Sequence, residues 1–325
     1  MKFLDLFAGI GGFRLGMEAA GHECIGFCEI DKFARASYKA IHDTKGEIEL
    51  HDITAVTDEF IRGIGSVDVI CGGFPCQTFS IAGNRRGFED TRGTLFFDIA
   101  RFASILRPKY LFLENVKGLL NHDGGATFET ILNTLDELGY NVEWQVLNSK
   151  NFGVPQNRER VFLVGHLRGK RTRRLFPIGR ESTTFDPKSK EIIIVGNTKN
   201  PTTKQKGTRS VVYHNKGLIG TTLSSHSCQE NNHTKVYDFY NKRIKDEVGT
   251  LTASGHQGNT KAGTFGILDG YRIRKLTPRE CWRLQGFPDW AFDKAQAVNS
   301  NSQLYKQAGN SVTVNVIEAI AKQFR

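Results

Sequence analysis

The sequence predicts an α/β protein with a doubly wound, mostly parallel sheet, followed by a smaller and mostly β domain. Three observations support this prediction. Short apolar strands alternate with amphipathic helices over the first half of the chain. After about residue 166 the alternation gives way to basic sequence rich in Gly, Thr and Asn. With 325 residues, the chain is also long enough for two domains.

The first half contains six apolar segments that are typical of strands and four amphipathic segments that are typical of helices. We expect strands at 3–7, 24–28, 67–71, 110–114, 142–147 and 160–165. We expect helices at 12–20, 32–41, 95–106 and 127–138. A last amphipathic helix is expected at 312–324 and should dock on the first domain. The predicted domains are therefore 1–180, completed by 300–325, and 181–299.

Positive charge is concentrated in one stretch of the chain. The formal net charge is +10, and residues 166–216 hold thirteen Lys and Arg against three acidic residues. Such a block favours a polyanionic partner, nucleic acid first, although a solvated basic face has the same composition. No run of about 18 apolar residues is present, so no membrane span is expected. Six cysteines in so long a chain form no disulfide framework, which favours a reducing cytoplasm.

One cysteine follows the carboxyl end of a predicted strand. Residues 67–71 lead into Gly72-Gly73-Phe74-Pro75-Cys76, and ligands bind at such strand ends in open α/β sheets. Pro75 fixes its own φ and keeps Phe74 extended, so the thiol is held in one direction. Without the rest of the chain, Cys76 is equally compatible with a small buried side chain. Cys24 and Cys28 lack a second pair with zinc-ligand spacing, so no metal site is expected.

Carboxylates end two other predicted strands. Glu29 follows the second strand, where a carboxylate can accept hydrogen bonds from ribose hydroxyls. Glu114 closes an apolar strand, where desolvation should raise its pKa and suit it to proton donation. The glycines of Phe7–Gly12 allow a ligand to approach closely, although Arg14 stands where the dinucleotide fingerprint requires glycine. Together with Asp52, which could bind an exocyclic amine, these positions favour a nucleoside cofactor over unrelated turns and helix caps.

Two arginines are expected to act together. Arg158 and Arg160 alternate in a predicted strand segment, so both side chains should leave the same face. Two guanidinium groups there could hold a carbonyl, orient Glu114 and stabilise a thiolate. Surface arginines beside a strand are the alternative.

Six motifs in a fixed order make the chain resemble the DNA (cytosine-5)-methyltransferases, of the compact kind found in bacterial and phage modification systems. The motifs are Asp5-Leu6-Phe7-Ala8-Gly9-Ile10-Gly11-Gly12, Phe74-Pro75-Cys76-Gln77, Glu114-Asn115-Val116, Gln156-Asn157-Arg158-Glu159-Arg160, Arg274-Lys275-Leu276-Thr277-Pro278-Arg279-Glu280-Cys281 and Gln307-Ala308-Gly309-Asn310-Ser311-Val312. They leave out only about 170–273, where the family keeps its variable target-recognition domain. The resemblance implies an S-adenosylmethionine-dependent methyltransferase (Rossmann-like) doubly wound sheet plus a small, mostly β target-recognition domain.

The resemblance also implies a mechanism. Cys76 would add to C6 of the target cytosine, and Glu114 would bond N3. Arg160 would hold O2, and Arg158 would support the carboxylate and the thiolate. S-adenosylmethionine would supply the methyl group for C5 and become S-adenosylhomocysteine, with no metal. The ring is blocked in a stacked duplex, so the target base must be flipped out.

The cofactor and DNA contacts implied by the resemblance come from several motifs. The cofactor residues are Phe7, Gly9, Ile10, Gly11, Glu29, Ile30, Asp52, Ile53, Pro75, Leu95, Asn310 and Val312. The DNA contacts are Gln77, Ser80, Arg92 and Thr250. The implied partner is double-stranded DNA, and we expect a monomer in the cytoplasm of a bacterium or a phage-infected cell. The open alternatives are the same chemistry on transfer RNA, a non-catalytic DNA-binding module and, most distantly, a nicotinamide-dependent dehydrogenase.

Overall fold

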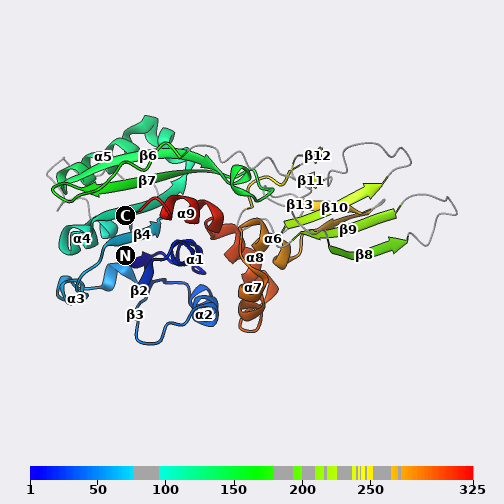
Figure 1. Ribbon diagram of the computed structural model, residues 1–325, viewed down its shortest axis with the longest axis horizontal. Helices are drawn as coiled ribbons and strands as arrows, with labels where there is room; N and C mark the ends of the chain where they lie inside the picture. The colour runs from blue at the N-terminus through cyan, green and yellow to red at the C-terminus, as the bar shows by residue number, and fades with distance from the viewer. Residues whose placement is uncertain are drawn as a thin grey trace. The chain divides into compact units, whose positions relative to one another are not determined.

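A computed structural model describes most of the first half of the chain, the C-terminal segment and parts of the region between them. The described residues are 1–75, 95–178, 193–199, 209–215, 218–224, 236–238, 241, 243–245, 247–251, 265–269 and 272–324. The chain divides into two compact units, which are described separately (Figure 1). Unit 1 comprises residues 1–147, 159–179 and 316–325, and unit 2 comprises residues 148–158 and 180–315.

Unit 1 is built on a seven-stranded sheet with the order β3-β2-β1-β4-β5-β7-β6. The strands are β1 (Lys2–Leu6), β2 (Glu23–Cys28), β3 (Ile48–Leu50), β4 (Val69–Gly73), β5 (Tyr110–Val116), β6 (Tyr140–Asn148) and β7 (Glu159–Leu167). The pairs from β3 to β5 are all parallel, and β7 runs antiparallel to β5. The strand order reverses between β1 and β4, which is the switch point where ligands bind in open α/β sheets.

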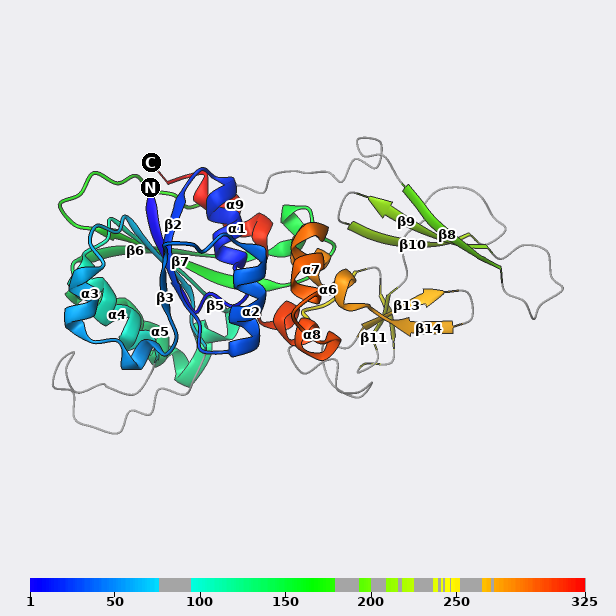
Figure 2. The same cartoon turned by 90° about the horizontal axis from the view of Figure 1, so that it is seen from below.

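Three helices cover one face of the sheet: α3 (Asp58–Gly63), α4 (Leu95–Leu106) and α5 (Ala126–Glu137). Their apolar residues, including Ile61, Phe102 and Ile131, form one buried cluster with Leu4, Leu111 and other strand residues. Figure 2 shows these helices on one side of the strands. Burial on both faces requires the nearly continuous apolar strands that the sequence shows.

The opposite face is covered by α1 (Gly12–Ala19), α2 (Lys32–Ile41) and α9 (Val314–Ala321), most of which belongs to unit 1. Phe112 of β5 contacts Phe13 of α1 and Phe324 at ring-centroid distances of 5.1 and 5.4 Å. A Cβ at Gly16 would lie 2.7 Å from Ile317, so only glycine allows α1 and α9 to pack this closely. The doubly wound fold predicted from the sequence is confirmed.

Two details of the predicted elements are wrong. The helix expected at 312–324 is shorter, because α9 begins at Val314 and ends at Ala321. Strand β7 begins at Glu159, so Arg158 precedes the strand, and strand alternation cannot place it on the same face as Arg160. The other predicted helices of unit 1 match within a residue at each end.

Unit 2 holds two small antiparallel sheets in the described part of the chain. One has the order β10-β9-β8 and comprises β8 (Ile193–Lys199), β9 (Arg209–Asn215) and β10 (Leu218–Ser224). The other has the order β12-β11-β13-β14 and comprises β11 (Val236–Asp238), β12 (Arg243–Lys245), β13 (Phe265–Asp269) and β14 (Arg272–Lys275).

Three helices of unit 2 surround one buried tryptophan. They are α6 (Pro278–Leu284), α7 (Asp289–Gln296) and α8 (Asn301–Asn310). Trp282 is fully buried, packs on Phe287 and Phe292, and donates its indole N–H to the carbonyl of Leu304. A Thr277–Glu280 capping box starts α6. None of the helices in the described ranges is long and apolar enough to cross a membrane.

Candidate active site

The carboxyl ends of β1, β4 and β5 meet at one edge of the unit 1 sheet. Leu6 of β1 lies opposite Gly72 of β4, and Gly73 lies opposite Glu114 of β5. A Cβ at Gly72 would lie 3.0 Å from the carbonyl oxygen of Leu6, so a residue without a side chain suits this close strand packing. The chain leaving β4 therefore starts beside Glu114 and reaches Cys76 three residues after Gly73.

Asn115 fixes the start of that exit. Its side chain is buried, and its Nδ2 donates to the carbonyl oxygen of Phe74 at 2.9 Å. Its Oδ1 accepts from the backbone N–H of Val116 at 2.8 Å. The amide thereby ties the end of β5 to the residue two positions before Cys76. No local sequence pattern predicts this role of Asn115, although the residue is a polar one directly after Glu114 and an apolar run.

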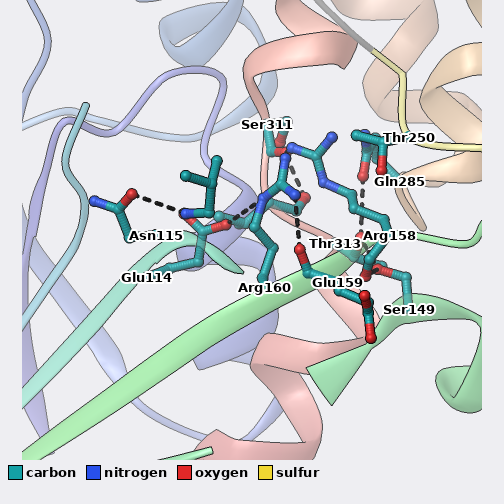
Figure 3. Close-up of polar contacts among 12 residues, drawn as sticks. Glu114, Asn115, Ser149, Arg158, Glu159, Arg160, Thr250, Gln285, Ser311 and Thr313 are labelled. Carbon is teal, nitrogen blue, oxygen red and sulfur yellow. Dashed lines mark hydrogen bonds and ion pairs between the residues drawn. The ribbon is translucent and has the colours of Figure 1, made fainter. Parts of the chain in front are cut away.

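Glu114 and Arg160 form an ion pair at this edge (Figure 3). Arg160 Nε lies 3.0 Å from Glu114 Oε1, and both side chains are largely buried. The antiparallel pairing of β5 with β7 brings them together, because Arg160 is opposite Val116, two residues beyond Glu114. Arg160 Nη1 also donates to the carbonyl of Glu159 at 2.8 Å. Desolvation strengthens this pair relative to a surface one.

Arg158 belongs to unit 2 and binds main-chain carbonyls there. Its Nη1 donates to Leu251 at 3.1 Å, and its Nη2 donates to Gly309 at 3.2 Å and to Ser311 at 2.8 Å. The last two carbonyls flank Asn310, a predicted cofactor residue. The geometry therefore makes Arg158 a clamp on the segment that carries Asn310 and Val312.

Glu29 lies just beyond β2 and is bound by two backbone amides. Gly9 donates to Oε2 at 2.8 Å, and Asp31 donates to Oε1 at 2.7 Å. Burial raises the pKa of Glu29, and the bonds from Asp31 and Gly9 oppose that shift. The carboxylate thus joins the loop after β1 to the start of α2 and keeps acceptor capacity for hydroxyl groups.

The loop after β1 has the backbone conformation of a ligand cradle. Phe7, Gly9 and Gly11 all have positive φ, at 55°, 57° and 83°. A Cβ at Gly9 would meet no atom within 4 Å, so its backbone faces open space. A Cβ at Gly11 would lie 2.1 Å from His42 Nε2, which excludes a side chain there. Ile10 is buried, so this loop offers mainly main-chain groups to a ligand.

The residues predicted to surround adenine lie along the same edge. Asp52 Oδ1 accepts from the backbone N–H and hydroxyl of Thr54 at 2.9 and 2.7 Å, and these bonds lower its pKa. Ile30 is 68% exposed, whereas Ile53 is buried and Leu95 packs against the core. An open glycine loop, a carboxylate with remaining acceptor capacity, an exposed apolar residue and a second carboxylate with a lowered pKa together have the chemistry that the nucleoside half of S-adenosylmethionine would need.

The remaining predicted site residues fall in three places. Pro75 is exposed at the end of the described segment after β4. Thr250 Oγ1 donates to the carbonyl of Asn157 at 3.2 Å within unit 2. Outside the described residues lie Cys76, Gln77, Ser80 and Arg92.

The described cysteines are unsuited to nucleophilic chemistry. Cys24, Cys28, Cys71 and Cys281 are buried and free. Burial raises the pKa of Cys24 and of Cys28 to about 12, which keeps these thiols protonated near neutral pH. In the same parts of the chain, no group of three or more His, Cys, Asp and Glu could hold a metal ion.

Comparison with solved structures identifies the fold class. Dnmt2 methyltransferase of S. pombe aligns with a TM-score of 0.64 at 19% identity, over 98% of this chain and 96% of that chain. A mutant of Spodoptera frugiperda DNMT2 aligns with a TM-score of 0.59 at 18% identity, over 98% and 97% of the two chains. At these identities the likeness concerns the fold alone, and both neighbours share it over nearly the whole chain.

The sequence comparisons identify the family. The model of the C-5 cytosine-specific DNA methylases matches residues 1–325. Type II methyltransferase M.HhaI of Haemophilus parahaemolyticus is 38% identical over 99% of this chain and 93% of its own length. For M.HpaII of Haemophilus parainfluenzae the values are 40%, 99% and 88%, and for the orphan methyltransferase M.SPRI of Bacillus phage SPR they are 32%, 99% and 97%. The chain belongs to the C-5 cytosine-specific DNA methylase family and is a DNA (cytosine-5-)-methyltransferase.

Proposed function

We propose that this enzyme transfers a methyl group from S-adenosylmethionine to C5 of a cytosine flipped out of a specific short duplex sequence, through a covalent Cys76–C6 intermediate. The observation that supports the proposal most directly is that Glu114, Arg160 and Asn115 lie at one sheet edge. Glu114 is paired with Arg160, and Asn115 holds Phe74, from which the chain runs directly to Cys76. Nucleophilic addition to a ring requires a thiol and a desolvated acid. Cys76 would supply the thiol, two residues after the tethered carbonyl of Phe74, and Glu114 would be the acid.

Each residue has a defined task in this mechanism. C5 of cytosine is a weak nucleophile, so the Cys76 thiolate first adds to C6 and pushes electron density toward C5. Glu114 bonds N3 and lets the ring accept that density, while Arg160 holds O2 and keeps Glu114 in place. Bound S-adenosylmethionine supplies an electrophilic methyl group. Removal of the C5 proton by a base then expels the Cys76 sulfur and restores the aromatic ring.

The cofactor would be held mainly by unit 1. Gly9 to Gly11 would line the methionine part, and Glu29 would take the ribose hydroxyls. Phe7 would stack on the adenine, Ile53 would pack on it, and Asp52 would accept from its amine. Ile30, Pro75, Leu95, Asn310 and Val312 complete the proposed set. Arg158 contributes by clamping the carbonyls on both sides of Asn310. S-adenosylhomocysteine is the expected product.

The two predicted domains would divide the work. We assign cofactor binding and chemistry to residues 1–180 with 300–325, and target recognition to 181–299, where Thr250 would contact DNA. Gln77, Ser80 and Arg92 would contact DNA from the loop that carries Cys76. The protein would act as a monomer in the cytoplasm of a bacterium or an infected cell. Its relatives include type II methyltransferases and a phage orphan enzyme, which favours a role in restriction–modification or phage self-modification.

The proposal is tested with labelled S-adenosylmethionine, duplex DNA, transfer RNA and a duplex carrying 5-fluorocytosine. Fluorine at C5 cannot leave as a proton, so a covalent protein–DNA adduct should survive denaturing electrophoresis. We expect label in duplex DNA, a trapped adduct with the wild type, and neither with Cys76→Ser, which should still bind the cofactor. Label in transfer RNA alone, or turnover retained by Cys76→Ser, would contradict the proposal.

A further inference from the structure

Arg101 of α4 binds the loop that carries Asp52 and Ile53. Its Nη2 donates to the carbonyl of Ile53 at 2.8 Å, and its Nη1 donates to the carbonyl of Val56 at 2.6 Å. These carbonyls stand at the first residue of the short 3₁₀ helix η1 (Ile53–Ala55) and just after its last residue. One planar guanidinium group therefore spans the whole turn.

The same guanidinium reaches two carboxylates. Nη2 lies 3.2 Å from Asp98 Oδ1 on α4, and Nη1 lies 3.1 Å from Asp58 Oδ1 on α3. The Arg101 side chain is 24% exposed, so these contacts are partly shielded from water. Four acceptors on three elements fit the rigid fork of an arginine and exceed the three donors of a lysine.

The location of Arg101 links two walls of the proposed adenine pocket. Leu95 is the first residue of α4, and Arg101 lies on the same helix. Its bond to Ile53 joins that helix to η1, whose first turn is capped by Asp52. Leu95, Ile53 and Asp52 are all proposed cofactor residues, so the spacing between them depends on this guanidinium.

Charge gives Arg101 a second effect on the pocket. Asp98 and Asp52 repel each other, and burial together with that repulsion raises the pKa of Asp98. The Arg101 cation opposes the shift and balances the negative charge of Asp98 near Asp52. Without Arg101, Asp98 would hold either an uncompensated charge or a proton beside the group that is proposed to bind the adenine amine.

We propose that Arg101 is a positioning residue that sets adenine recognition by fixing the Asp52–Ile53 turn against α4. The inference rests on the proposed use of S-adenosylmethionine. Arg101 touches neither the reacting atoms nor the sheet edge that carries Glu114. Its loss should therefore weaken cofactor binding and reduce the preference for adenine, while leaving the methyl transfer step intact at saturating cofactor.

The test compares Arg101→Met with Arg62→Met. Arg62 is an exposed arginine on α3 that forms loose pairs with Asp58, which it shares with Arg101, and with Glu59, at 4.0 and 3.6 Å. Among the described residues it has no hydrogen bond to η1, so its loss controls for removal of a nearby arginine. Calorimetry would measure the Kd of S-adenosylhomocysteine and of S-inosylhomocysteine, in which an oxygen replaces the adenine amine. We expect Arg101→Met to raise the first Kd about tenfold and to reduce the adenine preference about tenfold, with kcat within about threefold.

Hydrogen exchange in the cofactor-free protein tests whether Arg101 holds the Asp52–Ile53 turn. The amides of Thr54 and Ala55 bond to Asp52, and both should exchange about tenfold faster in Arg101→Met, whereas the amides of β2 should not change. Arg101→Lys serves if the Met variant does not fold, and it should show a smaller change in the same direction. An unchanged adenine preference, or a fall in kcat with an unchanged Kd, would overturn the inference. Failure of the wild type to bind S-adenosylhomocysteine would instead refute the proposed function.

Discussion

Glu29 and Glu114 are both acids at strand ends of one sheet, but different groups hold them. Glu29 accepts from the backbone amides of Gly9 and Asp31, whereas Glu114 pairs with the guanidinium of Arg160. Backbone amides are fixed by the fold and carry no titratable charge, so they orient the Glu29 carboxylate without supplying a countercharge. A guanidinium can follow its partner and supplies a full charge, which suits the role proposed for Glu114 on a reacting base. Two acids of one residue type on one sheet therefore differ in the groups that hold them, and the roles proposed for them follow that difference.

The largest effect should come from the ion pair. If Glu114 acts on the ring, Glu114→Gln should lower kcat by about 10²–10⁴ with little change in cofactor Kd. Arg160→Met should also lower kcat, and it should cost about 3–5 kcal/mol of the free energy of unfolding because it leaves Glu114 buried without its cation. The double variant should recover part of that stability. Single-turnover kinetics would measure the methyl transfer rate, and urea unfolding would measure the free energy of unfolding. Losses of stability that simply add up in the double variant would contradict the pairing.

A smaller and opposite pattern is expected at Glu29. If Glu29 binds the ribose hydroxyls as proposed, Glu29→Gln removes a charged acceptor, so the Kd of S-adenosylhomocysteine should rise about 10–100-fold while kcat at saturation falls little. Calorimetry and steady-state kinetics would separate the two constants. Lys39→Met is a suitable control, because Lys39 forms an exposed pair with Glu49 on the same unit. An unchanged Kd would move the ribose contact elsewhere and remove the contrast with Glu114.

The smallest effect is a pH dependence of stability. Burial raises the pKa of Glu29 above its ordinary value of 4.5. The folded cofactor-free protein therefore holds this proton more tightly than the unfolded chain, and its stability should fall as pH rises from the unfolded to the folded pKa and then level off. Glu29→Gln has no such proton and should lack this component of the slope. Urea unfolding from pH 4 to pH 7 would show it, and identical slopes would contradict the assignment.

Local sequence patterns predicted the strand ends well. The helix at 32–41 was predicted with its observed bounds, because Asp31 caps its first turn and the apolar periodicity is regular. Glu29 and Glu114 stand out in the sequence because each acid follows an apolar run, although β5 continues two residues past Glu114 to Val116. The helix at 278–284 was not predicted, although its Thr277–Glu280 capping box stands in the sequence. The basic composition of that half of the chain gives no indication of this helix.

Long-range partners could not be predicted from the sequence. Neither Arg158, which binds three carbonyls, nor Arg101, which binds the Ile53 turn, shows a local pattern that names its acceptors. Main-chain carbonyls are present at every residue, so a composition or a motif cannot indicate which of them a guanidinium reaches. The placement of Arg158 by strand alternation is wrong because strand β7 begins at Glu159, one residue after Arg158. The roles of Cys76 and its loop stay predictions.

The clamp made by Arg158 has a consequence for how the chain is made. Its three acceptors lie 93, 151 and 153 residues further along the chain. During synthesis from the N-terminus, Arg158 leaves the ribosome long before Gly309 and Ser311 exist. Helix α9, which packs on α1 through Ile317, is made later still. Unit 2 can therefore be completed only after the chain has been made as far as Ser311, and unit 1 only after the segment from Val316 onward has followed.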